Sequence, residues 1–261
     1  MNKNTVSKNF RKGSFGEAFR SVFSSLSLVK QHRLYAYFII PFFLNIIILS
    51  SIFYLSFHTL KPLIYDLITG SGFIFDALRT IITPLLIIIQ VIITIFIYSI
   101  VGNIITAPFN DFLSRKIEIK IFGENFDEKF SFKTLITDIL RVAGNLVKLL
   151  LLIIVAHLLI FLLNLIPVLG SILYAALSFL ITAFFFGFQF YDFPLERRRY
   201  TFGKKLKTAF RFIRQVMGVG AGFFLLSMIP VINFLGLNMA TIAATVMFSN
   251  YIKPTMAKNE Q

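Results

Sequence analysis

Few residues of this chain could do catalytic chemistry, and they are widely spaced. There is no Cys, and the three His stand apart at positions 32, 58 and 157. No serine lies in a Gly-x-Ser-x-Gly turn, and no acidic pair falls inside an apolar stretch. The usual arrangements for covalent catalysis or metal binding are therefore missing from the sequence. We expect a protein that is not an enzyme and needs no metal or cofactor.

One basic cluster has the chemistry of an anion site. Lys30-Gln31-His32-Arg33 places three nitrogen donors immediately before a long apolar stretch. Lys and Arg donate charge-assisted hydrogen bonds to oxyanions. We therefore expect this cluster at a membrane mouth, although long basic side chains also reach toward lipid headgroups with no ligand.

Uncharged amides recur within and beside the apolar stretches. Amides and helix N-termini together can hold an anion without a formal counter-charge. The simpler alternative is hydrogen bonding between helices, worth about 0.6 kcal/mol each. The amides are Asn45, Gln90, Asn103, Asn110, Asn164, Gln189, Asn233, Asn238 and Asn250. Asn110 is followed by Asp111 and by the i,i+3 pair Arg115 and Glu118, which we expect to meet on one helix face.

The elements that must position these residues are long and apolar. The chain is 57% hydrophobic and 15% charged with a mean hydropathy of +0.80, whereas about 25% charge is usual for a soluble domain. No formal charge appears over 34–60, 80–110, 149–191 or 215–252. About 20 apolar helical residues cross a bilayer. The chain is therefore predicted to be a membrane protein.

The net charge of +14 is concentrated in two segments. Residues 1–33 and 192–214 each carry +6. The positive-inside rule places both in the cytoplasm, and it puts 111–148 and both termini on the same side. We interpret the basic excess as a topology signal, with no nucleic-acid partner. The apolar run after Arg33 is too long for a cleaved signal peptide.

Proline divides each of the last two apolar stretches. Pro167 and Pro230 both follow an apolar run and precede Val, and each unit ends in a Tyr-x-x-Pro sequence. We interpret these units as an internal repeat, with chance similarity as the alternative. Residues 215–229 make about 22 Å of helix, too short to cross, so we expect hairpins that turn back within the bilayer. The run over 149–166 is long enough that a full crossing remains open.

The N-terminal segment has helical periodicity of its own. Its apolar residues are Phe15, Phe19, Val22, Phe23, Leu26 and Val29. We expect an amphipathic helix in the cytoplasmic headgroup layer.

The predicted fold is an all-α integral membrane protein with a single membrane domain over 1–261. It has two long transmembrane helices, two Pro-broken hemi-penetrating hairpins and an N-terminal amphipathic helix. The predicted segments are a cytoplasmic helix over 1–33, a first span over 34–60, a second span over 80–110 that continues into a cytoplasmic helix, hairpins over 149–191 and 215–252, and a basic cytoplasmic segment over 192–214.

At several of these positions the sequence resembles the CysZ sulfate permease family, part of the etoposide-induced 2.4 superfamily. The resemblance is carried by Pro41-x-x-x-Asn45, Ala107-Pro-Phe-Asn-Asp111, Gln189-Phe-Tyr-Asp192-x-Pro194 and Ile229-Pro230. It implies a bacterial inner-membrane oligomer that passes sulfate into the cytoplasm for cysteine synthesis. It also implies a Gly-apolar-Arg motif before the first span, where this chain has Arg33-Leu34-Tyr35.

We therefore expect import of sulfate or a related small oxyanion by a homo-oligomer in the lipid bilayer. The alternatives are transport of a different anion and a non-transporting membrane scaffold. The candidate substrate-binding residues are Lys30, His32, Arg33, Leu34 and Asn45. The candidate pathway or structural residues are Asn103, Asn110, Asp111, Arg115, Glu118, Asn233 and Asn238.

Overall fold

The computed structural model describes residues 13–67, 72–126 and 132–257, and every regular element in these ranges is helical. The chain divides into two compact units. Unit 1 comprises Met1–Phe38 and Asn110–Gln261, and unit 2 is Ile39–Phe109. The all-α prediction is confirmed.

Unit 2 is built from two long helices. Helix α3 spans Tyr35–Leu67, and helix α4 spans Phe73–Phe122 and passes through Pro108 into unit 1. Large apolar side chains such as Leu55 and Ile81 are exposed, whereas Gln90 and Thr94 are buried. Apolar groups outside and polar groups inside suit a helix pair surrounded by lipid.

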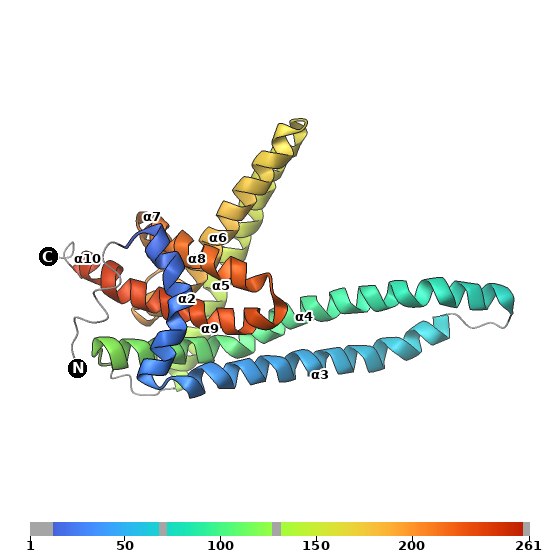
Figure 1. Ribbon diagram of the computed structural model, residues 1–261, viewed down its shortest axis with the longest axis horizontal. Coiled ribbons are helices and arrows are strands. Elements are labelled where there is room, and N and C mark those ends of the chain that lie inside the picture. Colours follow the sequence, from blue (N-terminus) through green and yellow to red (C-terminus); the bar gives the residue numbers. More distant parts are fainter. Residues whose placement is uncertain (1–12, 68–71, 127–131, 258–261) are drawn as a thin grey trace. The chain divides into compact units, whose positions relative to one another are not determined.

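Two helical hairpins follow in unit 1 (Figure 1). The first consists of α5 (Phe132–Phe161), the short 3₁₀ helix η1 (Leu162–Leu165) and α6 (Leu169–Arg197). After α7 (Phe202–Arg211), the second consists of α8 (Ile213–Ser227) and α9 (Pro230–Met247). A π-helical segment η2 (Phe248–Ile252) and α10 (Lys253–Ala257) end the described chain. Pro167 and Pro230 both lie where one helix gives way to the next, so the predicted breaks are confirmed.

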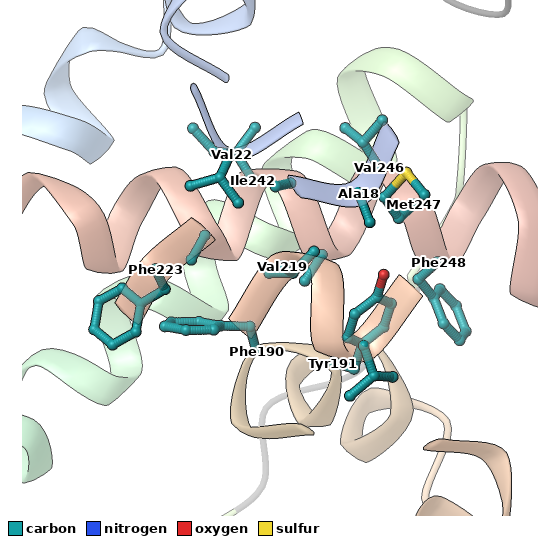
Figure 2. Packing of buried hydrophobic residues seen from close by; sticks show 14 of the residues in the cluster. Ala18, Val22, Phe190, Tyr191, Val219, Phe223, Ile242, Val246, Met247 and Phe248 are labelled. Atoms are coloured by element: carbon teal, nitrogen blue, oxygen red, sulfur yellow. The ribbon is translucent and has the colours of Figure 1, made fainter. Parts of the chain in front are cut away.

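The core of unit 1 lies between α2 (Phe15–His32), α6, α8 and α9. Figure 2 shows Val22, Phe190, Val219 and Ile242 converging from these four helices. Glycines permit the close approach: a β-carbon at Gly220 would collide with the carbonyl oxygen of Ala183. Large side chains pack beside this close backbone contact, as in the Phe190 and Phe223 rings, whose centroids are 4.9 Å apart.

Helix α2 packs through a face that the sequence did not indicate. A capping box between Ser14 and Glu17 starts it. Its buried residues are Ala18, Ser21, Val22, Ser25, Leu28 and Val29, which face α8 and α9. Val22 and Val29 of the predicted apolar stripe are buried, whereas Phe15, Phe23 and Leu26 are exposed. Gly218 and Gly222 let α8 approach α2 closely, and only short side chains of α2 fit between the two helices. The placement of α2 in the headgroup layer stays a prediction.

Four described helices are long and apolar enough to cross a membrane. Their spanning segments are Phe42–Thr59, Gly144–Leu165, Leu169–Arg197 and Leu235–Ala257. The two in the middle belong to the first hairpin, so both of its arms reach the length of a full crossing. Helix α8 has only 15 residues, and it is bent by 91° from α7. The argument that a helix is too short to cross the bilayer therefore holds for α8 of the second hairpin, and not for the first hairpin.

Candidate functional site

The predicted entrance residues lie at the C-terminal end of α2. Lys30 and Arg33 are exposed, and Lys120 of α4 donates to the backbone carbonyl of His32 over 3.2 Å. We call Lys30, His32, Arg33 and Lys120 the basic patch. Burial lowers the pKa of His32 below its ordinary value, and the charge of Lys120 lowers it further. His32 is therefore uncharged at neutral pH, and the positive charge of the patch comes from the other three residues.

Arg33 ends α2 in a left-handed backbone conformation, with φ 51° and ψ 48°. Glycine adopts this conformation freely, whereas a residue with a β-carbon is strained in it by about 1–2 kcal/mol. The Gly-apolar-Arg motif implied by the resemblance has its glycine at this position. A glycine at this position would adopt the same conformation without that strain.

Leu34 belongs to the core and not to the basic patch. Its side chain is fully buried, and its amide donates to the carbonyl of Val29 over 3.0 Å. Neither group is available to an anion, so Leu34 was wrongly included among the binding residues. Asn45 and Asn103 are on α3 and α4, but their side chains fall outside the described part of the structure.

Glu118 and Asp111 meet two arginines from the end of α6. Arg197 donates to Glu118 Oε2 over 2.9 Å and to Asp111 Oδ1 over 2.5 Å. Arg198 donates to Glu118 Oε1 over 2.7 Å. Glu118 is fully buried, and the Arg197 and Arg198 side chains are 6% and 17% exposed. We call these four residues the arginine cluster; its two positive and two negative charges balance.

The predicted partner of Glu118 was wrong. Arg115, one turn earlier on α4, donates to the backbone carbonyl of Phe126 over 2.8 Å. The helix alone supports an i,i+3 pair, but tertiary contacts with α6 supply better donors for a fully buried carboxylate. Arg197 and Arg198 were missed as site residues. The signal that could have found them is their position at the end of the apolar stretch 149–191.

A row of buried polar groups joins α4 to α9 beside the arginine cluster. The hydroxyls of Ser114 and Thr245 are hydrogen-bonded over 2.9 Å, and Ser114 also accepts from Arg197 Nη2 over 2.6 Å. Further along, Lys253 pairs with Glu124, so the two segments run in the same direction.

Further buried polar residues lie on both segments. We call this row the polar seam; its buried members are Asn110, Ser114 and Glu118 on α4, and Asn238, Thr241, Thr245 and Ser249 on α9 and η2.

Two atoms of the polar seam are buried without a hydrogen-bond partner among the described residues. They are Asn110 Oδ1 and Ser249 Oγ. Asn233 Oδ1, on the first turn of α9, is in the same condition. Leaving such a group unpaired costs about 1–3 kcal/mol, so these atoms mark places suited to a polar ligand or water. Ser249 belongs to a π-helical segment, a local feature often found at functional sites.

A second ion cluster ties α5, α6 and α7 together. The fully buried Lys205 pairs with Asp192 over 2.6 Å and with Glu196. Arg141 of α5 pairs with Glu196 over 2.6 Å. We call these four residues the lysine cluster. It is charge-balanced like the arginine cluster.

Comparison with known proteins gives the family. The sequence profile described as "Sulfate transporter CysZ/Etoposide-induced protein 2.4" matches residues 21–237. The chain belongs to this family. A relative from Pseudomonas syringae pv. tomato, named sulfate transporter CysZ, is 26% identical over 85% of this chain and 88% of its own length. One of the same name from Vibrio cholerae is 28% identical over 80% and 84%. The family resemblance and the membrane location are confirmed, and the transporter names of these relatives point away from catalysis.

Two features of the site have chemistry that suits an oxyanion. The basic patch has exposed cations at the surface of unit 1, and such cations raise the local concentration of anions. The arginine cluster has two guanidinium groups in a buried environment, where charge-assisted hydrogen bonds are strong. The polar seam adds uncharged donors and acceptors beside that cluster.

Proposed function

We propose that this protein is a permease that passes sulfate, or a closely related small oxyanion, into the bacterial cytoplasm without changing it chemically. The family match over residues 21–237, with relatives named sulfate transporter, carries the proposal. The buried arginine pair beside the polar seam supports it, because guanidinium forks suit tetrahedral oxyanions and a row of hydroxyls and amides replaces part of the hydration shell.

The basic patch serves as the cytoplasmic mouth in this proposal. Lys30 and Arg33 supply mobile positive charge, and His32 supplies an uncharged ring. Asn45 stays a candidate for substrate binding near the start of the first span. Asn103, Asn233 and Asn238 stay candidates for the pathway. Asn110 and Asp111 are also candidates, and they directly follow unit 2 in the sequence.

The proposed topology puts both termini in the cytoplasm, with the protein working as a homo-oligomer in the inner membrane. The +6 charge of each of the segments 1–33 and 192–214 supports this orientation. The second hairpin dips partway into the bilayer, because α8 provides only about 22 Å of helix. The first hairpin is proposed to do the same, although its arms are long enough to cross.

Uptake of labelled sulfate into liposomes containing the purified protein tests the function. We expect uptake above that of empty liposomes, with competition by selenate and thiosulfate. Arg33→Ala is expected to slow uptake, because it removes an exposed cation from the mouth; unchanged uptake would remove Arg33 from the mouth. If no flux and no anion binding are seen, the scaffold alternative holds.

Cysteine labelling tests the hairpins, and the absence of native Cys makes each variant a single reporter. Val168→Cys and Met228→Cys place thiols at exposed positions in the two turns. A turn within the bilayer is expected to resist a membrane-impermeant maleimide added from outside. Labelling as fast as that of a Cys introduced between residues 61 and 79, the segment predicted to lie outside, would show that the hairpin crosses.

A further inference from the structure

The arginine cluster has an unusual occupant for a transporter of anions. Its two guanidinium groups direct donors toward the carboxylate of Glu118, one to each oxygen, over 2.9 and 2.7 Å. Ser114 Oγ lies 2.6 Å from Arg197, so a hydroxyl borders the same place. Arg197 Nε and Arg198 Nη2 each donate one charge-assisted hydrogen bond to this carboxylate, and donors of this kind also bind oxyanions. Glu118 therefore lies where two guanidinium groups could receive an anion.

The burial of this carboxylate is not explained by stability. Removing an ion pair from water costs several kcal/mol per ion, and apolar residues of equal volume often stabilise a fold as well or better. Glu118 is fully buried, although a neighbouring turn of α4 presents the apolar Leu113 and Ile117 to the core. A retained buried charge with two arginine partners indicates a role in binding.

The surroundings hold the arginines in place independently of Glu118. Arg198 donates to the carbonyl of Pro194 over 2.8 Å, and its guanidinium carbon lies 4.6 Å from the Phe248 ring centroid. Arg197 is held by Asp111 and stacks 5.5 Å from the Phe126 ring centroid. The pair would keep its geometry if Glu118 moved away. The Ser114–Thr245 pair of the polar seam, which accepts from Arg197, gives a polar environment beside the site.

We propose that Glu118 is an intramolecular competitor that fills the Arg197–Arg198 site in the resting protein and is displaced by the transported oxyanion. This inference rests on the proposed function and specifies the regulation of its internal site. A dianion brings two negative charges to two guanidinium groups, so it competes effectively with a single carboxylate. The tethered carboxylate keeps the empty site neutral and closes it to weaker anions.

Binding of labelled sulfate to the purified full-length protein tests the inference through Glu118→Gln. The amide keeps the volume but lacks the charge, so the apparent affinity for sulfate is expected to rise by about 10-fold or more as the site becomes available. The unfolding temperature is expected to fall in sulfate-free buffer, because two buried cations lose a partner, and to recover with sulfate at constant ionic strength. Equal or weaker binding than in the native protein would overturn the proposal.

Glu196→Gln is the matched control. It removes a partly buried carboxylate from Arg141 and Lys205 in the lysine cluster, away from the polar seam. We expect a loss of stability that sulfate does not restore beyond its general stabilising effect on proteins. Equal recovery of both variants would show a non-specific salt effect and would overturn the proposal.

A second variant covers the case in which Glu118→Gln does not fold. Glu118→Asp keeps the charge but is one methylene shorter, so it cannot bond both guanidinium groups as closely. Its sulfate affinity is expected to lie above that of the native protein; no increase would overturn the inference. Liposome uptake by the native protein separates the two proposals. If the native protein takes up sulfate but both Glu118 variants bind it with unchanged affinity, only the competitor role is refuted. Tighter binding in the variants with no uptake refutes only transport.

Discussion

The two hairpins share a sequence pattern but have different surroundings. Both break at a proline followed by Val. In the first, only 6% of Gly144–Leu165 and 22% of Leu169–Arg197 is buried within the protein, whereas 78% of Leu235–Ala257 in the second is buried. Figure 1 shows the tip of the first hairpin extending away from the packed helices of unit 1. Most of the first hairpin is exposed, and only the C-terminal part of α6 joins the second hairpin in the core.

Small residues account for this difference. The second hairpin carries Gly218, Gly220 and Gly222, which let α2 and α6 approach α8 backbone to backbone. Bulky residues such as Leu158 and Ile172 are exposed along the first hairpin. Lipid is as apolar as leucine, so large apolar side chains gain nothing by leaving it, and helices pack where residues are small. In this protein glycine marks the core better than hydropathy does.

The largest effect is expected from filling the contact between α6 and α8. In Gly220→Val the new side chain meets the carbonyl of Ala183 and the backbone of Gly187, and neither is the flexible end of a side chain. We expect a loss of more than about 4 kcal/mol, seen as failure to give a monodisperse protein in detergent.

Gly144→Val in α5 is the matched control for that substitution. No atom lies within 4 Å of its new β-carbon. Gly and Val have similar helix propensities, so we expect a change within about 0.5 kcal/mol in thermal unfolding. Equal damage by both variants would contradict the assignment of core and membrane faces.

Truncation of large side chains should sharpen the same contrast. Ile242→Ala in α9 removes a fully buried side chain, and we expect a loss of about 2–5 kcal/mol because a cavity remains. Leu158→Ala in α5 removes a side chain that is 61% exposed, and lipid or detergent fills the space. The unfolding temperatures of the two variants decide; a larger drop for Leu158→Ala would place the first hairpin against another part of the assembly.

The sequence predicted where helices and helix breaks lie, but not which face of a helix packs against its neighbours. Charge-free stretches and prolines located the helices and their breaks, because these depend on local composition. The packing face of α2 could not be predicted from periodicity, because Ala18 and Ser21 are less apolar than Phe15, Phe23 and Leu26. Which side faces lipid is decided by the partner helix, here by glycines about 200 residues away.

The candidate site was predicted in part for a similar reason. Asn110, Asp111 and Glu118 were identified because polar residues near an apolar stretch are conspicuous in sequence. Their partners Arg197 and Arg198 were assigned to topology, since a basic segment after a span has that role by default. Pairing across 79 residues between Arg197 and Glu118 is a tertiary fact that no spacing rule supplies. Leu34 was included among the binding residues because of the motif. In the structure its side chain is buried and its amide donates to the carbonyl of Val29 at the end of α2.

The smallest expected effect comes from glycine substitutions in the turns of the two hairpins. Val168, in the first hairpin, has φ 63° and ψ −61°, and the amide after it donates to the carbonyl before it over 2.7 Å, which makes a strained γ-turn. Ile229, in the second, has φ −109° and ψ 109°, an extended conformation that any residue adopts. Val168→Gly is expected to raise the free energy of unfolding by about 1 kcal/mol, since glycine adopts positive φ without a steric cost and little side-chain packing is lost at an exposed position. Ile229→Gly is expected to lower it by about as much, because glycine gains conformational entropy in the unfolded chain and nothing in the folded one. Unfolding of both variants in the same detergent measures the opposite signs; equal signs would show that the strain at Val168 is relieved or offset in the assembled protein.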